Sequence, residues 1–181
     1  MTFDRYVRSA PRPPGPPAET ADTETVRRIV RELESLPPER ARFLAAFAYI
    51  LARAASADLH ISDVESAVIE RLVAEHGGLP EAHAVLVAEI AKAQSTLAGG
   101  TEDYVVTRQF RELSGPEERL RLLRCCYLVG AADDSISSEE SSVLQQIARE
   151  LDVERADVNV IRNEFAPKLS AIQAWFGRTA G

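Results

Sequence analysis

Apolar residues recur at helical spacing along most of the chain, and clear stop signals separate one such stretch from the next. Phe43, Phe47, Leu51 and Ala54, for example, recur every three or four residues, which is typical of an amphipathic helix. Alternating patterns typical of β-strands are essentially absent. With these stop signals, the pattern predicts helices over residues 23–36, 38–57, 62–76, 80–98, 101–113, 116–132, 137–151 and 154–165, with a short helix after Pro167. The sequence therefore predicts an all-α fold, a helical bundle.

Residues at the predicted helix ends are those expected of caps. Gly77 and Gly78 stop the third helix, and Thr101 is suited to cap the fifth. Ser114 to Glu117 reads Ser-Gly-Pro-Glu, a capping box with proline inside it, and is expected to open the sixth helix.

The first twenty residues differ from the rest of the chain. Five prolines lie between positions 11 and 17, which favours an extended, solvated backbone over helix. We therefore expect a proline-rich disordered arm over residues 1–20 and a single helical domain over residues 21–181.

Composition and charge exclude several classes of protein. A formal net charge of −7 disfavours a nucleic-acid partner. The longest apolar run, Phe43 to Ala52, is far shorter than the roughly 20 residues that cross a bilayer, and it stops at Arg53. No signal peptide is visible, and two adjacent cysteines, Cys125 and Cys126, do not suggest a disulfide framework. A soluble, cytoplasmic protein is expected.

The chain contains an internal duplication. A shift of 75 positions aligns two similar segments, in which polar and apolar residues match at the same helical phase. The matched pairs include Asp58 with Asp133, Ile61 with Ile136, Ser62 with Ser137, Glu65 with Glu140, Leu51 with Cys126 and Leu72 with Ile147. Each copy reads as a helix, a three-residue turn and a second helix, which is an αα-hairpin. We expect two repeated hairpins around two central helices, 38–57 and 116–132.

The turns of the two hairpins carry the candidate chemistry. Ser62 with Glu65 and Ser137 with Glu140 have the spacing of capping boxes, which would explain these residues without any ligand. The acids also suggest a site for a hard divalent cation, because such ions take oxygen ligands. The candidate metal ligands are Asp58, Glu65, Asp133 and Glu140, with Asp63, Asp134 and Glu139 as secondary candidates. The spacing is not that of an EF-hand, and a divalent metal is the one cofactor that the pattern suggests.

The doubled motif, Ala57-Asp58 to Glu65 and Ala132-Asp133 to Glu140, resembles the tellurite-resistance TerB family over roughly residues 38–165. In that family a glycine usually follows the aspartate, where this chain has Leu59 and Asp134. The resemblance implies an acidic helical bundle of the tellurite and metal stress response, suggested to bind metal ions. It also implies partners in stress-response complexes at the inner face of the membrane. A related domain in membrane-anchored J-domain cochaperones makes a metal-free adaptor role an alternative.

An enzyme is not expected. The chain has no glycine-rich phosphate loop and no nucleophile in a recognisable setting. Its three histidines lack metalloenzyme spacing: we expect His60 in a solvated loop, His76 at a helix C-terminus and His83 on the surface of the fourth helix. Two non-enzymatic functions remain, a metal-responsive stress protein and a protein-interaction module.

Overall fold

The structure, a computed structural model, describes residues 31, 34–58, 60–98 and 100–173, without the side chains of Asp58 and Ala98. Its helices are α2 (Pro38–Ala55), α3 (Asp63–Gly77), α4 (Glu81–Ala98), α5 (Thr101–Leu113), α6 (Pro116–Gly130), α7 (Ser138–Glu150) and α8 (Arg155–Glu164), and its 3-10 turns are η1 (Ser56–Asp58) and η2 (Ala166–Lys168). The predicted all-α fold is confirmed. The arm expected over residues 1–20, and most of the helix expected over 23–36, lie outside the described residues.

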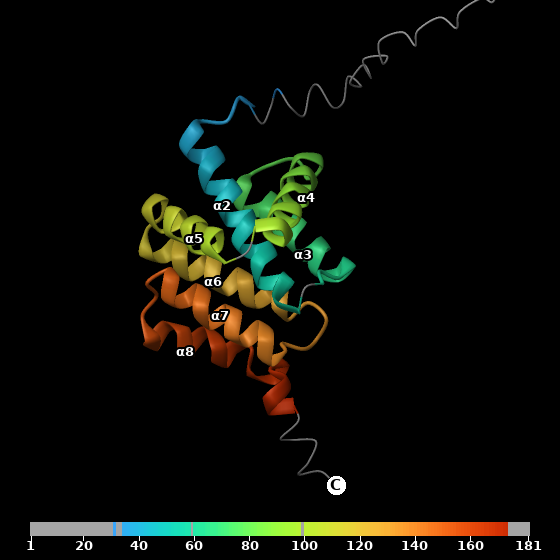
Figure 1. The fold of residues 1–181 in the computed structure, drawn as a ribbon, viewed down its shortest axis with the longest axis vertical. Coiled ribbons are helices and arrows are strands. Elements are labelled where there is room, and N and C mark those ends of the chain that lie inside the picture. The colour runs from blue at the N-terminus through green and yellow to red at the C-terminus, as the bar shows by residue number, and fades with distance from the viewer. Residues whose placement is uncertain (1–30, 32–33, 59, 99, 174–181) are drawn as a thin grey trace, which may run out of the picture.

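Helix α2 lies at the centre of the bundle. It contacts α3, α4, α5, α6 and α7, and Figure 1 shows it between the α3–α4 side of the molecule and the rows formed by α5 to α8. Every residue of α2 from Ala46 to Ala55 is buried, so its second half is covered on all sides. A run of alanines there lets neighbouring helix axes approach closely.

The two repeats form two hairpins that pack crosswise. Helix α2 contacts both α6 and α7, and α3 contacts α6, so each hairpin covers the apolar stripe of the other. The predicted central helices are both found, although α2 ends at Ala55 and α6 at Gly130, two residues earlier than expected. The difference arises at α2 because the chain tightens into the 3-10 turn η1 before the loop. Among the described residues no helix is both long and apolar enough to cross a membrane.

Two predicted caps are wrong in detail. Helix α6 has Gly115 as its N-cap, whose N–H donates to the Glu118 carboxylate at 2.9 Å, while the Ser114 hydroxyl donates back to the carbonyl of Phe110 in α5. Helix α5 is capped at Gly100 instead of Thr101. In both cases a glycine, and not the polar residue beside it, takes the N-cap position. The stop predicted after α3 is confirmed, with Gly78 in the left-handed conformation at φ 61°.

The end of the described chain closes over the turn of the second repeat. Ile136 donates its N–H to the carbonyl of Lys168 at 2.7 Å and accepts from the N–H of Ser170 at 2.9 Å, which forms an isolated parallel bridge with Leu169. Lys168 also pairs with Asp134. Ile136 and Leu169 are both buried, so this contact extends the core beyond α8.

A buried ion-pair network fixes α2 against α5 and α7. The Arg53 side chain is 6% exposed, and its guanidinium donates to both oxygens of Glu150, at 2.6 and 3.1 Å, and to the Thr107 hydroxyl at 3.1 Å. Asp103 lies 3.5 Å from the same guanidinium and accepts from the Tyr49 hydroxyl at 2.9 Å. Burial alone would raise the pKa of Glu150, but hydrogen bonds and charge from Arg53 bring it below its ordinary value. The sequence prediction treated Arg53 as the end of the apolar run, whereas the helix stays buried beyond it.

We predict that Arg53→Ala lowers the free energy of unfolding by about 3–5 kcal/mol, because it leaves two partly buried carboxylates without their buried partner. Chemical denaturation near neutral pH measures this change. Arg71→Ala is the matched control, because Arg71 forms only an exposed pair with Glu75 in the same helix and should cost less than about 0.5 kcal/mol. Equal losses in the two variants would contradict the structural role of the network.

Candidate functional site: the acidic turns and an apolar groove

Both capping boxes of the repeated turns are present. Ser62 accepts from the N–H of Glu65 at 3.2 Å, and the Glu65 carboxylate accepts from the N–H of Ser62 at 2.7 Å. Ser137 and Glu140 form the same pair of bonds at 3.1 and 2.7 Å. The capping prediction is therefore confirmed for both repeats, and each glutamate completes its box through Oε2.

The remaining acids of the turns lie at the surface. Asp63, Asp133, Asp134 and Glu139 are exposed, while Glu65 and Glu140 are buried. One Asp133 oxygen accepts from the N–H of Ser135 at 3.3 Å, and Asp134 pairs with Lys168. Within the described residues, which omit the Asp58 side chain, no group of three or more histidines, cysteines, aspartates and glutamates is placed to hold a metal ion.

The fold nevertheless brings acids of the two repeats together. Burial raises the pKa of Glu140, bonds from Ser137 oppose that rise, and the nearby charges of Glu65 and Asp133 add to it. The packing of the two hairpins against each other explains this interaction, since α2 contacts α7 and α3 contacts α6. The buried carboxylate of one repeat thus makes ionisation of the buried carboxylate of the other less favourable.

The cysteines and histidines do not form an activated nucleophile. Cys125 Sγ lies 3.8 Å from Nε2 of His76, whose Nδ1 is 3.0 Å from the carbonyl of Leu72. Burial raises the pKa of the Cys125 thiol to about 11, so this sulfur is a protonated, buried thiol at neutral pH. Cys126 is fully buried, as the repeat predicted, and burial raises its pKa as well.

The histidine predictions had mixed outcomes. His60 is exposed, as expected of a solvated loop. His76 lies in the last turn of α3, as expected, and its ring also stacks on Phe47 with centroids 5.1 Å apart. The surface position expected for His83 is wrong, because His83 is buried beside the apolar stripe that Ala84 and Ala88 form along α4. The surface position was predicted because histidine is polar, whereas its place next to the buried alanines of α4 determines its burial.

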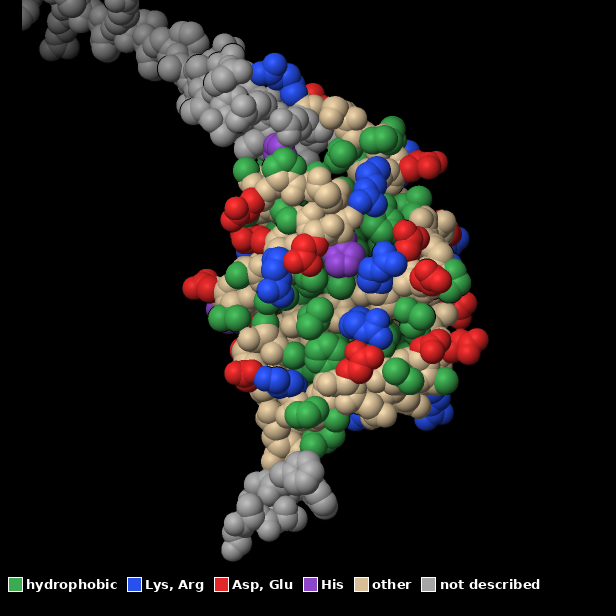
Figure 2. Space-filling view, turned by 180° about the vertical axis from the view of Figure 1, so that it is seen from behind, with side chains coloured by type: hydrophobic (Ala, Val, Ile, Leu, Met, Phe, Trp, Pro, Cys, Tyr) green, Lys and Arg blue, Asp and Glu red, His purple; other side chains and the backbone are tan. Residues whose placement is uncertain are grey.

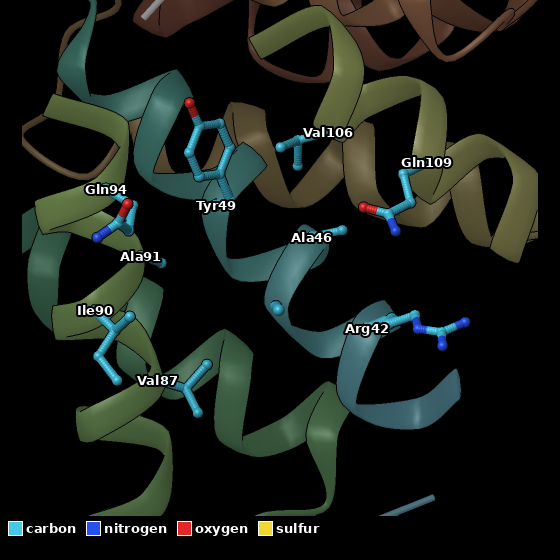
Figure 3. A pocket seen from close by; sticks show the side chains of 10 residues that line it. Arg42, Ala46, Tyr49, Val87, Ile90, Ala91, Gln94, Val106 and Gln109 are labelled. Carbon is cyan, nitrogen blue, oxygen red and sulfur yellow. The ribbon is translucent and has the colours of Figure 1, made fainter. Parts of the chain in front are cut away.

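An apolar groove that the sequence pattern alone did not predict lies between α2, α4 and α5. Its volume is about 350 Å³, and Figure 3 shows side chains from the three helices around it. The residues lining it are Arg42, Ala45, Ala46 and Tyr49 from α2, Val87, Ile90, Ala91 and Gln94 from α4, and Val106 and Gln109 from α5. Ile90 is 53% exposed although it is aliphatic.

The groove follows from small residues on two helices. Ala45 and Ala46 on α2 and Ala91 on α4 leave space that larger side chains would fill. The signal in the sequence was a second apolar face on α4, where Val87, Ile90 and Ala91 lie beside the buried alanine stripe. Figure 2, the face opposite to that of Figure 1, shows acidic and basic side chains interspersed, so the charge of −7 is not gathered into one patch on that face.

We predict that Glu140→Gln changes the pH dependence of stability. Because folding raises the pKa of Glu140, the stability that this group contributes is present below its ordinary pKa of 4.5 and is lost as pH rises through the raised value. Glutamine keeps the capping bond and does not ionise. The stability of the variant should therefore increase relative to that of the wild type across that pH range. Thermal unfolding from acid to neutral pH tests this. Glu117→Gln, which removes an exposed first-turn charge from α6, is the control, and equal pH profiles for the two variants would contradict the prediction.

Comparison with known proteins agrees with this architecture. The family model described as tellurite resistance protein TerB matches residues 43–163, more than half of the 181 residues. No curated protein and no solved structure matches the chain. The matched range begins within α2 and ends within α8, so it contains both acidic turns, most of both hairpins and every lining residue of the apolar groove except Arg42. The chain therefore belongs to the TerB family of tellurite-resistance proteins.

Proposed function

We propose that this chain is a non-enzymatic protein-interaction module that acts in the response to tellurite or related stress. The observation that carries the proposal is the apolar groove between α2, α4 and α5, which leaves aliphatic side chains such as Ile90 exposed to solvent. Apolar grooves between helices are common binding sites for an amphipathic helix of a partner protein. Family membership supports the stress-response role, and a cytoplasmic partner complex at the inner membrane belongs to the same proposal.

The shape and the rim of the groove favour a helical partner with acidic residues. Alanines at its floor allow a third helix to approach closely, while Ile90, Val87 and Val106 offer aliphatic contact from both sides. Arg42, Gln94 and Gln109 are the polar residues of the lining besides the hydroxyl of Tyr49. Arg42 can pair with a carboxylate, and the two amides can donate and accept hydrogen bonds at the edge of the contact.

We predict that Ile90→Glu abolishes binding at this groove. Helical peptides selected by display against the full chain should be amphipathic, and their affinity should fall at least about tenfold on the variant, because a charge replaces a central apolar contact. Val160→Glu is the matched control, since Val160 is 57% exposed on α8, outside the groove. Fluorescence anisotropy measures both affinities. Peptides that bind the Ile90 variant as tightly as the wild type would contradict the proposal.

A divalent-cation site at the acidic turns is the second candidate function. The observation in its favour is that Glu65 and Glu140 are both buried and that the charge of Glu65 contributes to the raised pKa of Glu140. These two carboxylates do not suffice for a hard cation, which takes several oxygen ligands. Asp58 and Asp133 are the proposed additional ligands, with Asp63, Asp134 and Glu139 secondary. A bound cation would offset the mutual repulsion of the buried acids.

If this second site exists, millimolar Ca²⁺, Mg²⁺ or Zn²⁺ should raise the melting temperature of the wild type. Ligand at about 100 times its Kd stabilises the folded state by about 2.7 kcal/mol, and the double variant Asp58→Asn with Asp133→Asn should lose that gain. Differential scanning fluorimetry with and without chelator gives the measurement. A wild-type melting temperature indifferent to all three ions would rule out the cation site and leave the interaction module standing.

A further inference from the structure

A second groove, between α7 and α8, is lined by arginines and by no acidic residue. Its volume is about 430 Å³, and its charged lining residues are Arg149, Arg155 and Arg162. Val153 and Val158 also line it, and the remaining two lining residues carry amides. Such a concentration of positive charge is unexpected in a chain with a net charge of −7.

Local sequence and helix geometry explain how the three arginines converge. Arg155 and Arg162 are seven residues apart on α8, which places them on one face of that helix with Val158 between them. Arg149 lies in the last turn of α7, and Val153 in the connection that follows it. Figure 1 shows α7 and α8 as adjacent rows of the bundle. Asp152 and Glu154 are exposed in the same connection but do not line the groove.

The three guanidinium groups have no protein partner among the described residues. Their side chains form no hydrogen bond and no ion pair there, and all three are exposed. Arg53, Arg124 and Arg108, by contrast, are paired with Glu150, Glu164 and Glu112. The donors in the groove are therefore available to a ligand.

We propose that the α7/α8 groove binds an acidic peptide segment of a partner protein. Guanidinium groups pair bidentately with carboxylates, and Val153 and Val158 would contact aliphatic side chains between the acidic ones. The groove has no aromatic lining residue, so it lacks a platform on which a nucleic-acid base would stack. A single phosphate would occupy only part of this volume and would leave both valines uncovered.

A labelled peptide of alternating glutamate and leucine serves as the probe, with binding to the full chain followed by fluorescence anisotropy at low salt. We expect the double variant Arg149→Ala with Arg162→Ala to bind at least about tenfold more weakly than the wild type. The double variant Arg71→Ala with Arg108→Ala removes the same charge from exposed sites on α3 and α5 and should bind as the wild type does. Replacement of Arg149 and Arg162 by lysine keeps the charge without the planar fork, so its affinity should be intermediate.

Three outcomes of the direct binding measurements would overturn the proposal, and a competition experiment supplies a fourth. The three are no binding of the peptide by the wild type at low salt, an equal loss of affinity in both alanine variants, and unchanged affinity in the variant lacking Arg149 and Arg162. Inorganic phosphate and vesicles of anionic phospholipid are tested as competitors. If either displaces the probe at a lower concentration than an unlabelled acidic peptide does, the groove binds phosphate, and the peptide proposal is wrong. Thermal melts verify that every variant is folded, and the lysine variant provides the comparison if the alanine variant is not.

Discussion

Helix α2 is covered on all sides along its second half, and a helix in that position must pair every polar group that it carries. Arg53 meets this requirement through Glu150, Thr107 and Asp103, which come from α7 and α5. This network also connects to the apolar groove, because Asp103 accepts a hydrogen bond from the hydroxyl of Tyr49, which lines the groove. Burial and Asp103 raise the pKa of Tyr49 to about 12, which keeps its hydroxyl protonated as a donor. One buried cation thus fixes the relative positions of α2, α5 and α7, and two of these helices, α2 and α5, line the groove together with α4.

The duplication is symmetric in its buried apolar residues and its capping boxes, and asymmetric at other charged positions. Leu51 and Cys126 occupy equivalent buried positions, as do the two capping glutamates. By contrast, the position equivalent to Arg53 is Leu128, which is exposed, and the position equivalent to Glu150 is Glu75, which pairs with Arg71 at the surface. The shared apolar positions therefore define the common helical scaffold. The Arg53–Glu150 ion pair, by contrast, occurs only where the two copies differ in sequence.

Periodicity and capping residues were sufficient to predict the helices, the repeat and the two capping boxes, because these depend on residues close together in the sequence. Features that depend on packing between distant helices were not predicted. Arg53 looked like the end of a buried run because its carboxylate partners lie in α5 and α7. His83 looked exposed because it is polar, and the apolar groove depends on which side of α4 its neighbours leave uncovered. The proximity of Glu65 and Glu140 likewise requires the crosswise packing of the hairpins.

The contact between Ile136 and Leu169 sets the boundary of the folding unit. The family match ends at residue 163, yet the second acidic turn is completed by backbone groups of Lys168 and Ser170. A chain cut at the end of the match would leave the N–H and carbonyl of Ile136 without partners and would uncover a buried isoleucine. The structural domain therefore extends at least to Ser170, and the edge of a family pattern underestimates the shortest segment that can fold with both turns intact.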